Sequence, residues 1–523
     1  MILRSRSIAL AAALPLVLAL APAPADKGVF AENVSVVGAL PETSIIATQF
    51  ASDEPTMYAS TLSGIRTYDI SDPLHPRLQG VLPMAFFQNE NVKLGERANG
   101  TKFLLVGYDL FGTSPTFRPD DVGTTNEIVV VNVTDPRNPF ITARLQTETR
   151  THTVGCANDA CTHAFTSGSD GAFEVIDLND LTNPEIVATV EGPQGPNNSF
   201  GSGIGHDWDV DEAGVAWWVG TGGIIAYDVS DPTDPQILNT SDEHSIDGAW
   251  NNYVSHNSQR PNAAAFPAGE REPEQSERRG PPGGVPNQGH GGPAEHPGPA
   301  PGDAETQGGV TSPAEGDGPS IEDGNVLYVT EEDLSDELCD DTLGGFQTWH
   351  VPALHGTNDD GEPGEGTITP LDQWTTELAG DPAAQLPAAA FCSAHYFDTH
   401  DSGIVAQGWY QQGLRILDPR DPENIEQIGF YITAGAQETW GASWVPAYDQ
   451  DGVQTGELTN LLYTEDPSRG MDILEVDLPE EGAAVVAVEA PILPQWRAGN
   501  PDLAARAQAS EWGGACVLPP SPS

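Results

Sequence analysis

The stretch Gly64-Ile65-Arg66-Thr67-Tyr68-Asp69-Ile70-Ser71-Asp72-Pro73 decides the fold, because the same pattern returns further along the chain. It recurs as Gly223-Ile224-Ile225-Ala226-Tyr227-Asp228-Val229-Ser230-Asp231-Pro232 and as Gly413-Leu414-Arg415-Ile416-Leu417-Asp418-Pro419-Arg420-Asp421-Pro422. Each copy is a run of β-branched or aromatic residues that alternates sides, as a half-buried strand does. An Asp-Pro turn then ends the run, because proline cannot continue a ladder. The repeat therefore indicates one β unit that recurs along the chain.

Weaker copies bring the series to seven, at Glu127 to Pro136, Gly171 to Leu181, Gly345 to Val351 and Gly470 to Asp477. Further apolar segments before and after each copy give every unit about four strands. A four-stranded propeller blade needs about 40–50 residues, so the longer intervals contain insertions. We therefore predict an all-β protein that forms a β-propeller of seven four-stranded blades. An array of β-sandwiches is the alternative, but it does not require one repeated turn.

The turn phrase resembles that of the LVIVD-repeat family of secreted and cell-surface proteins. The resemblance covers residues from about 34 to 490, and it is weaker where His350 and Glu475 replace the aspartate. It implies a β-propeller fold, and it implies no defined activity.

Composition excludes several classes of protein. The 523 residues include 77 Asp and Glu against 21 Lys and Arg, which gives a formal net charge of −56. This charge repels phosphate backbones and anionic lipids, so we expect neither nucleic-acid binding nor membrane insertion. The 56 glycines and 45 prolines also argue against a mainly helical protein.

Residues 1–25 resemble an export signal. Arg4 and Arg6 precede the apolar run Ile8 to Leu20, and Ala23-Pro24-Ala25 offers the small-x-small pattern that signal peptidase cleaves. We expect cleavage after Ala25 and a secreted, extracellular protein. Residues 491–523 are expected to form a C-terminal tail without an apolar anchor.

Residues 258–324 differ in composition from the rest of the chain. They are rich in Gly, Pro, Glu and Gln and contain few apolar residues. Such a segment buries too little surface to offset its ordering entropy, so we predict a disordered insertion in the fifth blade. A smaller insertion is expected at 109–126. Either residues 34–38 or residues 483–488 should supply the strand that completes the last blade.

The five cysteines suggest disulfides in an exported protein. Cys156 and Cys161 flank a stretch that reads as a turn, so they could bridge a hairpin; metal ligation is the alternative. Cys339 and Cys392 form the next plausible pair, which leaves Cys516 over.

Several predicted blades have a histidine at the beginning of their first strand. These histidines lie at a similar distance in sequence from the aspartate that marks each repeat. His152, His206 and His395 precede the first aspartate of their repeats (Asp177, Asp228 and Asp418) by 25, 22 and 23 residues. His256 takes the same place once the insertion is discounted. Equal phase in a propeller means equal height along the central channel, so the four imidazoles should face one axis.

Two acids, Glu90 in the second blade and Glu438 in the seventh, lie at a similar phase. Imidazoles in such a group are typical ligands of Zn, Cu and Fe. The alternative is that these residues fill a wet channel and hydrogen-bond with one another. Asp207, Asp209 and Asp211 alternate on one strand, which favours either calcium or a solvated strand face.

Two functions follow from these patterns. The first is a non-catalytic scaffold that binds an extracellular protein or a small-molecule ligand through the propeller faces. The second is a Cu-, Zn- or Fe-dependent enzyme, most plausibly an oxidoreductase, in which His152, His206, His256 and His395 hold the metal.

Overall fold

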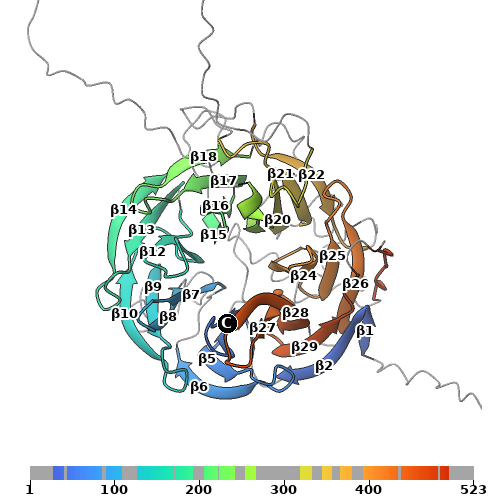
Figure 1. Cartoon of the computed structure of the whole chain (residues 1–523), viewed down its shortest axis with the longest axis horizontal. Helices are drawn as coiled ribbons and strands as arrows, with labels where there is room; N and C mark the ends of the chain where they lie inside the picture. Colours follow the sequence, from blue (N-terminus) through green and yellow to red (C-terminus); the bar gives the residue numbers. More distant parts are fainter. Residues whose placement is uncertain are drawn as a thin grey trace, which may run out of the picture.

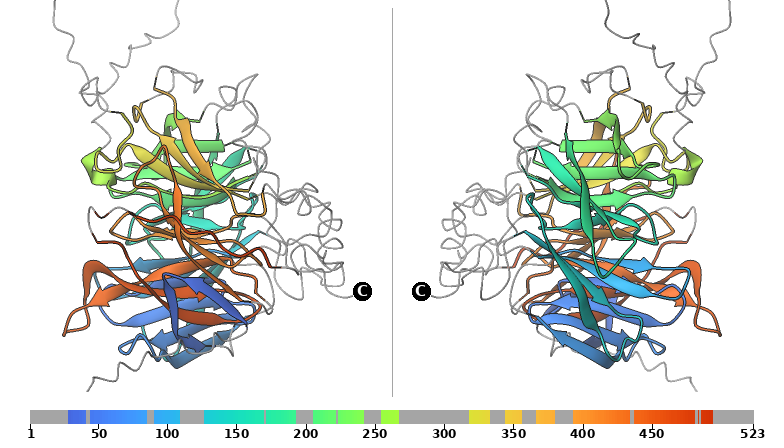
Figure 2. Two further views of the ribbon diagram at one scale, coloured as in Figure 1. Left: turned by 90° about the vertical axis from the view of Figure 1, so that its right-hand side faces the viewer. Right: turned by 90° about the vertical axis from the view of Figure 1, so that its left-hand side faces the viewer.

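Seven antiparallel sheets surround one central axis, and each sheet runs from the axis to the rim (Figure 1). The predicted β-propeller of seven four-stranded blades is therefore confirmed. In side view the blades form a thick disc (Figure 2). The computed structural model describes residues 28–40, 44–84, 90–108, 126–169, 171–192, 205–221, 223–241, 254–266, 318–332, 344–355, 366–379, 393–433, 437–480, 483 and 485–493.

Each of the first four blades consists of four strands that are consecutive in the chain. The first strand of each blade lies nearest the axis, and the fourth lies at the rim (Figure 1). The first blade contains β3 (Ala47–Phe50), β4 (Thr56–Thr61), β5 (Gly64–Asp69) and β6 (Arg77–Pro83). The second contains β7 (Val92–Glu96), β8 (Lys102–Tyr108), β9 (Glu127–Asn132) and β10 (Phe140–Gln146). The third contains β11 (Val154–Cys156), β12 (His163–Thr166), β13 (Ala172–Asp177) and β14 (Glu185–Glu191). The fourth contains β15 (Gly205–Val210), β16 (Val215–Gly220), β17 (Gly223–Asp228) and β18 (Gln236–Thr240).

The last three blades include the two that take strands from the beginning of the chain. The fifth blade contains β19 (Val254–Gln259), β20 (Val326–Glu332), β21 (Phe346–His350) and β22 (Thr369–Trp374). The sixth contains β23 (Phe397–Thr399), β24 (Val405–Gly408), β25 (Leu414–Asp418), β26 (Glu426–Thr433) and, at its edge, β1 (Val29–Glu32). The seventh contains β27 (Gly441–Tyr448), β28 (Gln454–Glu465), β29 (Met471–Val476) and β2 (Val34–Leu40).

The ring closes where β2 pairs with β29, so the outer strand of the last blade comes from the beginning of the chain. This assigns the closing role to residues 34–40. Residues 485–493 instead pack beside the sixth blade, where the Val488 amide donates to the Gln427 carbonyl and Leu493 is buried. With β1 before residue 34 and Leu493 after residue 490, the ordered part extends slightly beyond the predicted range at both ends.

The repeated turn is built from aspartates that accept hydrogen bonds from backbone amides two residues later. Asp69 accepts from the Ser71 amide at 2.9 Å, and Asp228 accepts from the Ser230 amide at 2.9 Å. Asn132 makes the same bond to Thr134 at 3.1 Å. These Asx turns reverse the chain between the third and fourth strands of a blade, which explains why the phrase recurs.

The hydrophobic core lies between neighbouring blades. Trp217 of the fourth blade and Trp349 of the fifth share one buried cluster, which also contains Leu327. Another cluster joins the seventh blade to the first through Tyr463 and Met57. Each blade is therefore stabilised mainly by its neighbours, and the closed ring leaves no blade with an uncovered face.

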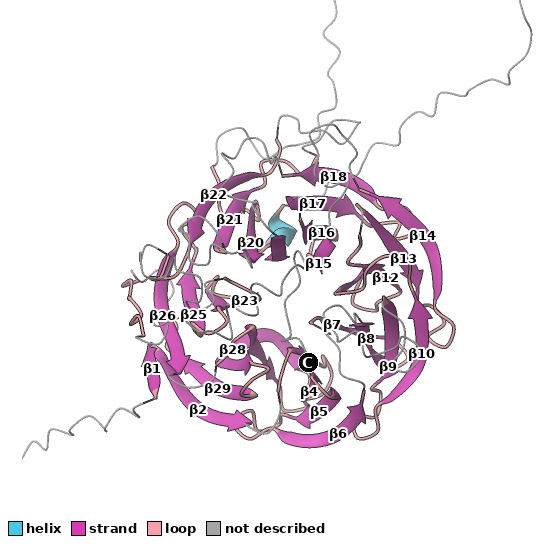
Figure 3. Ribbon diagram, turned by 180° about the vertical axis from the view of Figure 1, so that it is seen from behind, coloured by secondary structure: helices cyan, strands magenta, loops and turns pink. Residues whose placement is uncertain are grey.

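The prediction that residues 258–324 are disordered is wrong at both ends of this segment. β19 continues to Gln259, and the 3-10 helix η2 (Ala263–Ala265), cyan in Figure 3, follows it. The reason is Arg260, whose guanidinium pairs with buried Asp211 of the fourth blade at 2.7 Å. The same guanidinium donates to the Phe266 and Gly324 carbonyls at 3.1 Å each.

Other expectations concern residues that the structure does not describe. The predicted signal segment 1–25, the insertion at 109–125, residues 267–317 and most of the tail, 494–523, lie outside the described residues. Among the residues that are described, no helix has the length and apolar character needed to cross a membrane.

Closure of the ring can be tested on β2. Val34 is 8% exposed and packs against the sixth and seventh blades, whereas Val36 on the same strand is 46% exposed. We expect Val34→Asp to lower the free energy of unfolding by about 3 kcal/mol, because it buries a charge without a partner. Val36→Asp, the matched control, should change it by less than about 0.5 kcal/mol. Equal effects of the two variants in denaturant unfolding would contradict this closure.

Candidate metal centre

Five buried side chains, one from each of the second to sixth blades, meet on the propeller axis. Glu90, His152 and His395 each lie two residues before the first strand of their blades, β7, β11 and β23. His206 lies within β15 and His256 within β19. None of the five is more than 2% exposed. The structure thus brings together the four histidines predicted from the repeat and one of the two predicted acids.

The backbone explains why these side chains face the axis. Pairing between β15 and β16 is interrupted between Gly205 and Asp207, which leaves His206 at a bulge. Pairing between β19 and β20 is interrupted between Ser255 and Ser258, which places His256 at another bulge. A bulge redirects a side chain that a regular ladder would point elsewhere.

The histidines surround the carboxylate of Glu90. Its Oε2 atom lies 3.1 Å from Nε2 of His152, 3.4 Å from Nε2 of His206 and 3.8 Å from Nε2 of His256. Its Oε1 atom lies 4.0 Å from Nε2 of His395. The same type of nitrogen is therefore presented by all four rings to one point.

The opposite ring nitrogens of two histidines bind backbone carbonyls. Nδ1 of His206 lies 2.7 Å from the His256 carbonyl oxygen, and Nδ1 of His395 lies 2.9 Å from the Trp440 carbonyl oxygen. A carbonyl can only accept, so each Nδ1 carries the proton. In a neutral ring Nε2 then holds a lone pair that is directed towards the cluster, which is the arrangement found in histidine metal ligands.

Burial also affects the charge state of the rings. It lowers the pKa of His256 well below its usual value and the pKa of His395 to about 4, so both rings are neutral at pH 7. Burial opposes ionisation of Glu90, but the facing His152 and the other imidazoles hold the pKa of this carboxyl well below its usual range. The cluster therefore combines an ionised Glu90 with at least two neutral rings, those of His256 and His395.

Glu332, at the end of β20, joins the cluster although sequence reasoning missed it. Its Oε2 atom lies 3.7 Å from Nε2 of His256, and its Oε1 atom accepts a hydrogen bond from the Tyr410 hydroxyl. Ligand atoms of Glu332, His256 and His395 lie within 4.8 Å of one another, as do those of Glu90, His206 and His256. The sequence shows only that Glu332 is an acid at the end of an apolar strand. Acids at such positions are also common where a strand end is exposed to solvent, so this feature alone did not indicate a site.

Glu438 does not join the cluster. Its side chain is half-buried and accepts a hydrogen bond from the Ser468 hydroxyl at 3.0 Å. Its blade begins with β27 at Gly441, so Glu438 lies one residue further from its strand than Glu90 does from β7. Neither metal-capable group among the described residues contains Glu438.

Two of the five cysteines lie within the described residues. Cys156 and Cys161 form the predicted disulfide, which spans the β11–β12 hairpin, so these two thiols are not available as metal ligands. Cys339, Cys392 and Cys516 lie outside the described residues.

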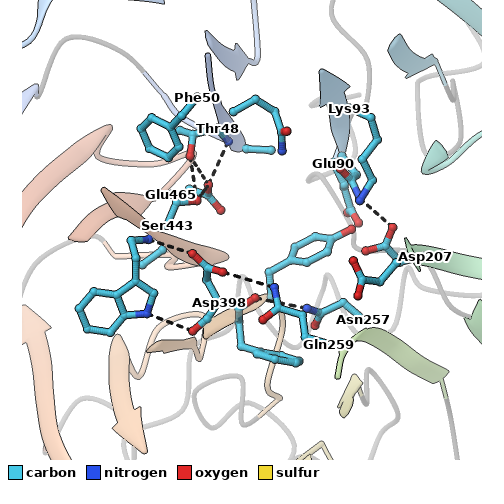
Figure 4. A pocket seen from close by; sticks show the side chains of 18 of the residues that line it. Thr48, Phe50, Glu90, Lys93, Asp207, Asn257, Gln259, Asp398, Ser443 and Glu465 are labelled. Carbon is cyan, nitrogen blue, oxygen red and sulfur yellow. Dashed lines mark hydrogen bonds between the residues drawn. The ribbon is translucent and has the colours of Figure 1, made fainter. Parts of the chain in front are cut away.

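A cavity of about 380 Å³ reaches the cluster at Glu90 (Figure 4). Its other acidic lining residues are Asp207, Asp209, Asp398 and Glu465, and its one basic lining residue is Lys93. The predicted row of aspartates on β15 is therefore divided, because Asp207 and Asp209 line the cavity whereas Asp211 pairs with Arg260.

Hydrogen bonds hold two of these acids in place. Asp398 accepts from the Trp444 amide at 2.9 Å, from the Thr399 amide at 3.0 Å and from the Gln259 amide group at 3.3 Å. Glu465 Oε1 accepts from the Thr48 amide and hydroxyl and from the Ser443 hydroxyl, each at 3.0 Å. Burial raises the pKa of Asp398, and it raises the pKa of Glu465 and of Asp209 to about 7.

Comparison with known proteins yields similarity at the level of the propeller only. No protein-family model matches the sequence. No curated protein matches it. The β-propeller domain of Cps50 (Swd1) from Myceliophteria thermophila is 10% identical, with a TM-score of 0.48, and the match covers 85% of this chain and 99% of that one.

Two further solved structures are similar to a comparable extent. A protein from Lactobacillus plantarum is 10% identical, with a TM-score of 0.43 and a match that covers 84% of this chain and 96% of that one. The periplasmic gluconolactonase PpgL of Pseudomonas aeruginosa is 11% identical, with a TM-score of 0.45 and coverage of 86% and 95%.

The raised pKa of Glu465 predicts a specific dependence of stability on pH. Between about pH 4.5 and pH 7 the folded protein keeps a proton that the unfolded chain has lost, so this group makes stability fall as the pH rises. Glu465→Gln removes the effect. The free energy of unfolding of the variant, relative to the parent protein, should therefore increase by roughly 2–3 kcal/mol from pH 4.5 to pH 8.

Denaturant unfolding at both pH values measures this difference. Glu457→Gln, on the exposed part of β28, is the control and should follow the parent protein at both pH values. A difference between Glu465→Gln and the parent that stays constant with pH would show that Glu465 is ionised in the folded protein.

Proposed function

We propose that this propeller is a metal-dependent protein that holds one ion of Cu, Zn or Fe on the Nε2 atoms of His152, His206, His256 and His395. The observation that carries the proposal is the convergence of these four atoms on the buried carboxylate of Glu90, at 3.1–4.0 Å. The proposal selects the second of the two functions that the sequence allows.

Electrostatics supports a cation at this point. The neutral ring of His395 directs its Nε2 lone pair at a carboxylate, because its Nδ1 atom donates to a carbonyl, and Nδ1 of His206 is held by a carbonyl in the same way. A lone pair that faces a negative charge in a buried site is repelled by it, and a metal ion between the two would remove this repulsion. One metal ion would bind all four nitrogens and the carboxylate at once, and imidazole with carboxylate is a donor set that Cu, Zn and Fe accept.

The residues around the proposed metal site support a reactive centre that a molecule in the cavity can reach. Glu332, held by Tyr410, supplies a second carboxylate beside His256 and His395. Glu90 lies between the histidines and the cavity, so a molecule in the cavity can approach the centre from one side. A redox metal held there would supply electron transfer to or from such a molecule, and on this basis we favour an oxidoreductase.

The scaffold hypothesis depends on other features of the molecule. Binding of an extracellular protein or a small ligand through the propeller faces needs no buried histidines on the axis. Secretion and membership of the LVIVD-repeat family remain predictions from the sequence, and both are compatible with either function.

Metal content and its dependence on one histidine test the proposal. We expect the purified protein to contain close to one equivalent of Cu, Zn or Fe by elemental analysis, and His256→Ala to lose most of it. His75→Ala is the matched control, because the side chain of His75 is 78% exposed. A chelator should lower the melting temperature of the parent protein and of His75→Ala, because metal binding stabilises only the folded state.

The same chelator should leave the melting temperature of His256→Ala unchanged, with circular dichroism used to establish that this variant is folded. A parent protein that contains no metal as purified, and takes up none when Cu, Zn or Fe is added, would contradict the proposal. The histidines would then be hydrogen-bonded filling of the channel, and the scaffold function would be favoured.

A further inference from the structure

We propose that the cavity beside the histidine cluster binds a small organic cation, whose ammonium group lies among Asp209, Asp398 and Glu465. This inference rests on the proposed function, because Glu90 belongs both to the cavity and to the metal cluster, and it names the class of molecule that reaches the centre. Three independent features of the cavity support it: the sign of its charge, the unpaired hydroxyl of Ser258 and its aromatic wall.

The charge of the lining is strongly one-sided. Glu90, Asp207, Asp209, Asp398 and Glu465 contribute carboxyl groups, whereas Lys93 contributes the one amine among the lining residues. Burial raises the pKa of Asp207, and the charge of Lys93, which lies beside it (Figure 4), opposes that rise. Five carboxyl groups against one amine give the lining an excess of negative charge whenever more than one of the acids is ionised, so the cavity attracts cations and repels anions.

A buried polar atom of the lining is left for a ligand. Glu465 is 6% exposed, and the three hydrogen bonds that its side chain accepts from described residues all go to Oε1. The hydroxyl of Ser258, which is 3% exposed, has no hydrogen-bond partner within the described part of the chain. Buried polar atoms without partners cost free energy, and an ammonium group together with a polar substituent would satisfy them.

An aromatic wall favours an organic cation over a hydrated metal ion. Phe50, Tyr396 and Trp444 line the same cavity as the acids. Aromatic rings attract ammonium groups and exclude the water that a metal aqua ion would carry. Calcium needs six to eight oxygen ligands, but both oxygens of Asp398 already accept hydrogen bonds from N–H groups.

The volume of the cavity limits the size of the ligand. About 380 Å³ is at the lower end of the range for small-molecule sites, so a compact molecule with a few carbon atoms fits. The expected ligand is therefore a small protonated amine or quaternary ammonium compound that carries a hydroxyl or another polar group.

Choline and its uncharged carbon isostere, 3,3-dimethylbutan-1-ol, test the inference by isothermal titration calorimetry on the full-length protein. We expect choline to bind and the isostere to bind at least about ten-fold more weakly, because the two differ in the charge alone. Asp209→Asn should weaken choline binding by about ten-fold or more, since it removes one of the carboxyl groups that line the cavity. Asp451→Asn, in an exposed turn, is the control and should bind choline as the parent does.

Elemental analysis of the same preparations separates this inference from the proposed function. Protein that contains metal but binds choline no better than the isostere would overturn the organic-cation site and leave the metal centre standing. Binding of choline by protein that contains no metal would support the site and count against the metal centre. Calcium binding that Asp209→Asn abolishes, without choline binding, would also overturn the inference.

Discussion

The pairing of β2 with β29 is the interaction on which the rest of the structure depends. It closes seven blades into a ring, and closure fixes the distance of every first strand from the axis. Once that distance is fixed, residues at one phase of the repeat lie at one height along the channel. His152, His206 and His395 meet for this reason, although more than 240 positions separate the first from the last. An open array of the same blades would leave them apart.

The cluster on the axis is polar and buried, and its surroundings hold it rigidly. The blades gain their stability from apolar contacts with their neighbours, so the axis itself is not needed for the core. Carbonyl groups orient His206 and His395, and Tyr410 holds Glu332. Fixed donors of this kind would lower the reorganisation needed to bind the proposed metal ion, and the acidic cavity beside them would give the proposed cation a route to the same point.

Much of this arrangement could be predicted from the sequence, because the blades repeat a local signal. The Asx turn at Asp69 and its copies identified the blades, and a similar spacing of 22 to 25 residues before that turn identified His152, His206 and His395. Glu332 could not be identified in this way, because it lies on a second strand, outside the phase of the histidines. Glu438 takes a similar position in its repeat, but it lies three residues before its first strand, whereas Glu90 lies two residues before β7. Arg260 is ordered by a partner in another blade, Asp211, and composition carries no information about such a contact.

Anomalous X-ray diffraction from crystals of the purified protein tests the central claim most directly. Data collected on both sides of the absorption edges of Fe, Cu and Zn would locate any of these metals. The account predicts one strong anomalous peak on the propeller axis, within bonding distance of the Nε2 atoms of His152, His206, His256 and His395 and beside Glu90. Density without an anomalous signal at that point, in crystals soaked with each of the three metals, would contradict it.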